Sequence, residues 1–301
     1  MSTLTMEPGT ATHSQLLGEQ VDTLLDEGKI NEARRAVDNV VEKARSSVGS
    51  DLPSKRELAS FLEVKGDLHR SLDEFEEATA DYQEALSLLG TDRSNDESVG
   101  RVCAGLAFVH DCEQRTMEAK SLYERAIACY ERLTPPLLLE VAGISNNLAY
   151  IYQAEDNFDQ AETLLLKALR ISHEELGQEN ELTASFCNNV GNLYLKADYG
   201  EQAREMHMMA LDTRSKILGE HHLDTAQSHN NLALVLVQSD DIDAAKRHFD
   251  RALDTYEGNL AVGADDYETT VANYCDVLNS LGEEKAAKAL KARATKKLAK
   301  V

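Results

Sequence analysis

Four asparagines recur at a constant spacing and have the chemistry to hold a polypeptide backbone. The series has a spacing of 42 residues and consists of Asn147, Asn189, Asn231 and Asn273. A primary amide offers two donors and an acceptor, so one side chain can bind both the N–H and the C=O group of an extended segment. Amides at a regular spacing can also bond from one repeat to the next and only stabilise a stack. The residues alone leave both roles open.

Two further side chains extend this polar face, and one aromatic side chain adjoins it. Asn192 and Lys196 follow Asn189 by three and seven residues, which places all three on one face of a helix. Tyr150 lies one helical turn from Asn147 and would add an aromatic wall beside the amides. The candidate site therefore combines amides, one cation and one aromatic ring.

The histidines and the catalytic motifs indicate no second kind of site. His221, His222 and His229 lie close together in the sequence, but no cysteine or carboxylate completes a zinc set, so we expect no metal. The sequence contains no glycine-rich phosphate loop, no GxSxG elbow and no HExxH helix, so we expect neither an enzyme nor a cofactor. His207 takes a core position that other repeats fill with a large apolar or aromatic side chain, which indicates a locally softer core.

Composition restricts the partners and the compartment. The 301 residues include 53 acidic and 31 basic residues, for a net charge of -22, which disfavours nucleic acid as a partner. Five cysteines without a CxxC pair are typical of reduced thiols and predict a cytoplasmic protein. We expect no signal peptide in the first residues, because they lack a basic start and an apolar run. No apolar stretch approaches the ~18 residues of a membrane helix.

Three series of small residues show that the chain is built from repeats. The first has spacings of 41 to 45 residues: Ala33, Ala78, Ala119, Ala161, Ala203, Ala245 and Ala287. The second follows it by seven residues: Val40, Ala85, Ala126, Ala168, Ala210, Ala252 and Ala294. The third precedes it by twelve: Val21, Gly66, Ala107, Ala149, Gly191, Ala233 and Cys275. Seven residues are two helical turns, so small side chains share one face and let helices approach closely.

Each repeat is therefore predicted to be a helix, a short turn and a second helix. The fold class is all-α, a right-handed superhelical solenoid of about seven helix pairs, with residues 1–13 disordered and 14–301 forming a single solenoid. The predicted repeats are 14–50, 57–98, 99–140, 141–182, 183–224, 225–266 and 267–301.

The repeats resemble the tetratricopeptide domain of kinesin light chains. Their unit starts with Asn-Asn-Leu-Ala, as at 146–149 and 230–233, with Asn-Asn-Val-Gly at 188–191 as a variant. Their Leu-Gly link to the next unit is matched by Leu-Gly-Glu-His-His-Leu-Asp at 218–224 and by Leu-Gly-Gln-Glu-Asn at 176–180. The similarity is good over 141–266, looser over 57–140 and weak at both ends. Because no heptad coiled coil precedes the first repeat, we do not expect a kinesin heavy chain as partner. The compact form is similar to bacterial kinesin light chain-like proteins, some of which occur alongside bacterial tubulins.

This resemblance implies a non-catalytic adaptor that binds a protein segment in a groove lined by the first helix of each pair. It favours the groove role for the asparagines, and implies a link between a tubulin-type cytoskeletal filament and cargo or membrane. A chaperone-type carboxylate clamp is not expected, because its cationic positions hold Asn188, Thr269 and Asn273. An intracellular peptide-sensing tetratricopeptide regulator is the alternative, although such regulators usually carry an N-terminal effector domain.

The last predicted helix differs from the rest of the chain in charge. Residues 285–301 contain no acid and seven basic residues: Lys285, Lys288, Lys291, Arg293, Lys296, Lys297 and Lys300. Cations near a helix C-terminus stabilise its dipole, but seven exceed what one terminus needs. We expect this helix to dock onto an acidic surface, either a tubulin-type filament or an anionic membrane, with capping of the array as the alternative.

Overall fold

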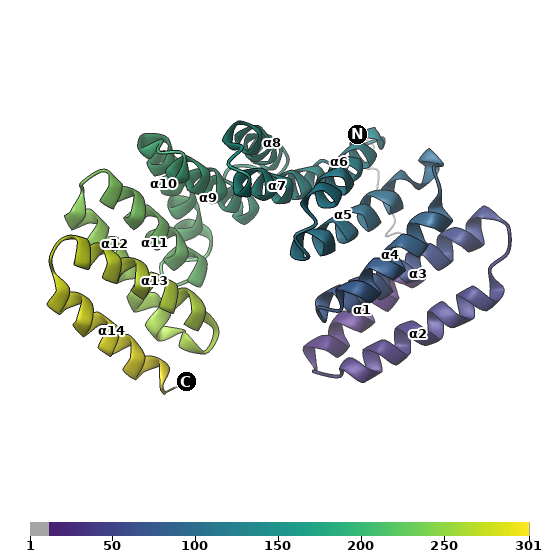
Figure 1. Cartoon of the computed structure of the whole chain (residues 1–301), viewed down its shortest axis with the longest axis horizontal. Coiled ribbons are helices and arrows are strands. Elements are labelled where there is room, and N and C mark those ends of the chain that lie inside the picture. The colour runs from purple at the N-terminus through teal and green to yellow at the C-terminus, as the bar shows by residue number, and fades with distance from the viewer. Residues whose placement is uncertain (1–11, 301) are drawn as a thin grey trace, which may run out of the picture. The chain divides into compact units, whose positions relative to one another are not determined.

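The computed structural model describes residues 12–300 and contains only helices over that range, which confirms the all-helical prediction (Figure 1). Residues 1–11 of the segment predicted to be disordered lie outside the described residues. The first helices are α1 (His13–Asp26), α2 (Ile30–Ser47), α3 (Leu52–Ser71), α4 (Phe75–Leu89), the 3-10 helix η1 (Arg93–Asn95), α5 (Asp96–Cys112) and α6 (Thr116–Arg132). The others are α7 (Leu138–Ala154), α8 (Phe158–Leu176), α9 (Glu181–Lys196), α10 (Gly200–Ile217), α11 (Leu223–Gln238), α12 (Ile242–Gly258), α13 (Leu260–Ser280) and α14 (Glu284–Leu298).

These helices divide into two compact units, residues 1–144 and 145–301, and the boundary falls inside α7. In each unit, helices that follow one another in the sequence pack side by side (Figure 1). The prediction of one continuous right-handed superhelix concerns how the two units join and stays a prediction.

The same turn joins the two helices of each pair. The residue before the second helix donates its backbone N–H to a carbonyl five residues earlier, at 2.7–2.9 Å, in seven places. The residue directly before this donor has a positive φ in each place: Gly28, Asp73, Gln114, Asp156, Asp198, Asp240 and Gly282. This is the 6→1 bond that commonly ends a helix, and glycine or a short polar residue tolerates the left-handed conformation it needs.

The first helix of every pair begins before its predicted repeat, and α3 and α13 depart most, by about five and seven residues. Helix α3 begins at Leu52 because Asp51 caps it, accepting a hydrogen bond from the backbone N–H of Ser54. Helix α13 begins at Leu260, but its backbone is non-helical at Gly263, so a short helical segment precedes the main helix.

The small-residue series lies in the core. Ala203 and five of its six equivalents are fully buried, and Ala287 is 4% exposed. The second and third series are buried as well, with two exceptions. Val40 is only partly buried, because Val37 and Val41 take the core positions of α2, and Cys275 is partly buried near the end of the array.

Close packing explains the glycines of the third series. A Cβ atom added to Gly66 would lie 2.7 Å from the ring of Tyr82, and one added to Gly191 would lie 2.7 Å from the ring of His207. A large ring on the second helix thus fits against a missing side chain on the first. In the last repeat, Lys291 occupies the position of these rings and is exposed.

Replacing Ala203 with leucine is expected to lower the free energy of unfolding by about 1–3 kcal/mol, because a fully buried position has no space for the added methylenes. Chemical denaturation of the variant and the wild type measures this loss. The exposed Ala299→Leu variant is the control and should change stability little. An unchanged midpoint for Ala203→Leu would contradict the packing register.

Candidate functional site

The asparagines of the second unit form hydrogen bonds between successive first helices. The amide Nδ2 of Asn189 donates to Asn146 Oδ1 at 2.8 Å, and that of Asn231 donates to Asn188 Oδ1 at 2.8 Å. The next step repeats the pattern, because Asn273 donates to Asn230 Oδ1 at 3.2 Å. Each bond joins one repeat to the preceding one, so these amides do contribute to the stack.

These bonds leave part of each amide available. Asn189, Asn231 and Asn273 are half-buried, and each uses one of its two N–H groups in the contact with the preceding repeat. Within residues 12–300, Asn189 Oδ1 accepts no hydrogen bond. Asn147 is exposed, and only its oxygen is engaged, at 3.5 Å from Asn146 Nδ2. The row therefore retains donors and acceptors for a second polypeptide.

The other predicted side chains lie beside this row. Tyr150 is 44% exposed, and partial burial raises the pKa of its phenol. Lys196 is exposed and donates to Gln153 Oε1 of α7 at 3.4 Å, and Asn192 is half-buried. The three come from first helices of successive pairs, like the asparagines.

Arg214 is a buried cation that the sequence analysis missed. It is 4% exposed and donates to Ser185 Oγ, Ser228 Oγ, Gln227 Oε1 and the carbonyl of Asp224 at 3.0–3.2 Å. Burial lowers its pKa. Because it bonds to α9 and α11 from α10, it joins two repeats. The sequence places Arg214 in the buried stripe of α10, which could have predicted its role. A charged residue at a buried position must bond its donors to groups within the protein.

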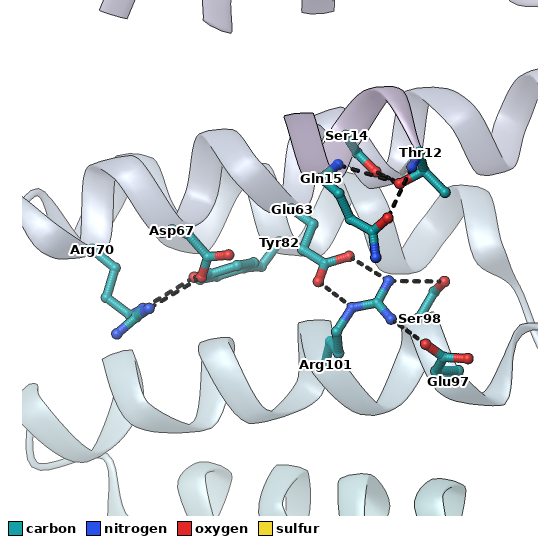
Figure 2. Close-up of polar contacts among 10 residues, drawn as sticks. All are labelled: Thr12, Ser14, Gln15, Glu63, Asp67, Arg70, Tyr82, Glu97, Ser98 and Arg101. Atoms are coloured by element: carbon teal, nitrogen blue, oxygen red, sulfur yellow. Dashed lines mark hydrogen bonds and ion pairs between the residues drawn. The ribbon is translucent and has the colours of Figure 1, made fainter. Parts of the chain in front are cut away.

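The equivalent face of the first unit holds a large cavity. It has a volume of about 1120 Å³ and is lined by the start of α1, by α3 and by α5, which are first helices of their pairs. Figure 2 shows Arg101 of α5 between Glu63 of α3 and Glu97 of its own helix. Its Nε atom lies 2.6 Å from Glu63 and its Nη1 atom 2.8 Å from Glu97. No asparagine row marks this face, so the sequence analysis did not predict it.

Helix α3 makes further polar contacts. Burial raises the pKa of Glu63, and the charge of Arg101 opposes that shift. Next to this pair, the Tyr82 hydroxyl donates to Asp67 at 2.7 Å, and Arg70 donates to both residues (Figure 2). The two first-helix faces thus differ: amides dominate in the second unit and ion pairs in the first.

His229 and His248 lie in the packed layers, whereas His221 and His222 lie in an exposed link. His229 Nδ1 and His248 Nδ1 are 2.8 Å apart, and His229 Nε2 is 3.9 Å from Glu220. His221 and His222 are exposed in the link before α11. No group of three or more metal-binding side chains lies together among residues 12–300.

His207 is expected to make the protein sensitive to acid. It is fully buried, and burial lowers its pKa from 6.5 to about 4. Between these values the unfolded chain binds a proton that the folded chain does not, so stability falls by about 1.4 kcal/mol per pH unit as the pH drops below 6.5. Urea unfolding at pH 7.5, 6.5 and 5.5 measures the slope. In a His207→Leu variant, position 207 has the same residue type as the equivalent Leu165 of the preceding repeat. Its free energy of unfolding should depend less steeply on pH. Equal slopes in both proteins would refute a neutral buried imidazole.

The basic residues of α14 divide into paired and unpaired groups. Arg293 Nε lies 2.7 Å and Lys297 Nζ 3.0 Å from the carboxylate of Glu257, and Lys288 pairs with Glu284 within the helix. Among the described residues, the remaining four form no ion pair: Lys285, Lys291, Lys296 and Lys300. None of the helices between residues 12 and 300 is long and apolar enough to cross a membrane.

The outer face of α14 also departs from the preceding repeat. Lys291 and Thr295 are exposed at the positions, 42 residues later, of Phe249 and Leu253, which are buried. Asp276 of α13 likewise replaces Leu234. A terminal repeat that caps a solenoid needs polar residues on its outer face, so these residues fit the alternative that α14 caps the array.

Paired helices with this recurrent turn and small-residue packing define a tetratricopeptide repeat protein. Models described as Tetratricopeptide repeat match residues 140–201, 187–258 and 59–88. Within that class the chain is kinesin light chain-like. It is 34% identical over 119 residues to Protein KINESIN LIGHT CHAIN-RELATED 3 of Arabidopsis thaliana, covering 38% of this chain and 18% of that protein. Protein KINESIN LIGHT CHAIN-RELATED 1 is 27% identical over 149 residues, which are 49% of this chain and 24% of that protein. The matched region thus spans between about a fifth and a quarter of these relatives.

Solved structures agree with this assignment. The structure of BtubC (BKLC) from P. vanneervenii is 26% identical, has a TM-score of 0.65, and the match covers 75% of this chain and 90% of that one. The apo form of RapI has a TM-score of 0.61 at 14% identity, with 81% of this chain and 99% of that chain covered, and shares the fold alone.

Proposed function

We propose that the chain is a non-catalytic adaptor that holds an extended segment of a protein partner on the first-helix face of its second unit. The observation that carries this proposal is the asparagine row, in which each amide keeps an N–H group after bonding to the preceding repeat. Amides that bind main-chain groups select an extended conformation and little sequence. Tyr150 and Lys196 at the same face would add contacts to a ring or an acidic side chain.

The partner assembly in this proposal is a tubulin-type filament, which the adaptor links to cargo. The likeness to BtubC and to kinesin light chain-related proteins supports this choice. The unpaired lysines of α14 are the proposed contact with the filament, since tubulin-type surfaces are acidic. An anionic membrane is the other acidic surface that these lysines would fit.

Cosedimentation with filaments tests this part of the proposal. A variant with Lys285, Lys296 and Lys300 changed to serine removes three unpaired charges and keeps the contacts of Arg293 and Lys297 with Glu257. It should bind filaments less at low salt, and the difference should shrink at high salt because exposed charges are screened. A parallel cosedimentation with anionic vesicles distinguishes a membrane from a filament as the acidic surface that α14 binds.

The control removes three exposed cations from elsewhere, by changing Arg35, Lys43 and Arg247 to serine. Both variants then have the same net charge. Equal sedimentation of the two variants would exclude specific docking by α14 and leave capping as its role. Failure of wild-type chain to sediment with filaments at all would refute the filament as the partner.

A further inference from the structure

A small cavity lies beside the link between α4 and α5 in the first unit and shares no lining residue with the larger cavity of that unit. Its volume is about 260 Å³, the scale of a single small group. The link contributes Gly90, Thr91, Asp92 and Arg93, helix α5 contributes Asp96 and Val99, and helix α6 contributes Arg125, Cys129 and Arg132. Three arginines around one small cavity are unusual in a chain whose net charge is -22.

The acids of this cavity are already engaged. Asp96 is buried and accepts two hydrogen bonds from Arg132, at 2.8 and 3.0 Å. Asp92 Oδ1 accepts from the backbone N–H of Ser94 at 2.9 Å. Within the described chain, the side chains of Arg93 and Arg125 form no ion pair or hydrogen bond, and Arg132 Nη1 donates to no acceptor. The cavity therefore holds two unpaired guanidinium groups and a third that is fixed in place.

Both unpaired arginines act on groups in the cavity. The charge of Arg125 opposes the burial that raises the pKa of Cys129, and the charge of Arg93 helps to keep the pKa of Asp96 low, after the larger effect of Arg132. Arg125 and Arg132 are seven residues apart on α6, so they project from the same face of that helix. Arg93 approaches from the link.

We propose that this cavity binds a phosphate group. Guanidinium groups present forked donors that match the oxygens of phosphate. Two such groups from one face of α6 and a third from the link suit a tetrahedral anion better than a planar carboxylate. Binding supplies the counter-charge that Arg93 and Arg125 lack within the chain. The site is independent of the asparagine row and of any filament contact.

Calorimetric titration with inorganic phosphate, at constant ionic strength set with chloride, tests the site. Wild-type chain should bind phosphate, and a variant with Arg93 and Arg125 changed to serine should bind at least about tenfold more weakly, because two charge-assisted contacts are lost. Arg132 is kept, since it holds Asp96. The matched control changes the exposed Arg35 and Arg247 to serine and should bind phosphate like the wild type.

Phosphoserine and serine in parallel titrations separate the sources of the phosphate group. Tighter binding of phosphoserine than of inorganic phosphate would assign the site to a phosphorylated side chain, and the reverse order to the free ion. No phosphate binding by the wild type would overturn the proposal. Equal losses in the two double variants would overturn it as well, because they would show that only total charge matters.

Discussion

Replacement of Tyr82 by alanine is expected to lower the free energy of unfolding of the first unit by about 3–5 kcal/mol, the range for truncating a large buried side chain. The ring is fully buried. It packs so closely that a Cβ atom added to Gly66 or Gly105 would lie 2.7 or 2.8 Å from it. Its removal leaves a cavity that neither glycine can fill. Chemical denaturation followed by circular dichroism measures the loss.

A phenylalanine at position 82 is the matched control. It keeps the ring and removes the hydroxyl that donates to Asp67 at 2.7 Å, so it should cost about 1 kcal/mol. Similar losses for the two variants would show that the hydrogen bond, and not the packing against the glycines, stabilises this layer.

Replacement of Asn147, Asn189 and Asn231 by alanine is expected to weaken binding of the partner segment by at least about tenfold and up to about a hundredfold. Each lost amide contributes about 1 kcal/mol, and about 1.4 kcal/mol corresponds to a factor of ten. The probe is a set of peptides selected on the wild-type chain from a display library, with affinity measured by fluorescence anisotropy.

Asn188→Ala separates binding from stacking. Asn188 is 5% exposed, and its Oδ1 accepts from Asn231 at 2.8 Å and lies 3.1 Å from His207 Nδ1. The substitution removes a contact between repeats without removing a side chain of the asparagine row, so peptide affinity should stay near the wild-type value. An affinity loss as large as that of the triple variant would mean that the amides act only through the stack.

The core of this fold was predictable because its packing repeats with the sequence. Ala203 and its equivalents are small at a fixed spacing, and the glycines opposite Tyr82 and His207 follow from the same need for close approach. His207 was identified as an exceptional core residue from its position alone, and the structure has it fully buried between Gly191 and Asn188.

The polar contacts between repeats were less predictable. Periodicity places Asn189 on a helix face, but the preceding asparagine, Asn146, lies one residue off the series and supplies the acceptor. Whether an amide meets that partner depends on the offset between neighbouring helices, which the spacing does not give. The same holds for Arg101, whose partner Glu63 is 38 residues away on another helix.

The exposed Lys291 and Thr295 bear on how long an array of this kind grows. Inside a solenoid, each repeat offers to the next repeat the same kind of surface that the previous repeat offered to it. The repeat pattern by itself therefore sets no limit to the length of the array. A terminal surface of the internal type could accept the first repeat of another molecule, and such head-to-tail contacts would continue into an open fibre. A lysine where the preceding repeat buries Phe249 makes that contact costly, because the charge would have to leave water. Two polar residues on one helix thus oppose polymerisation at the C-terminal end of the array.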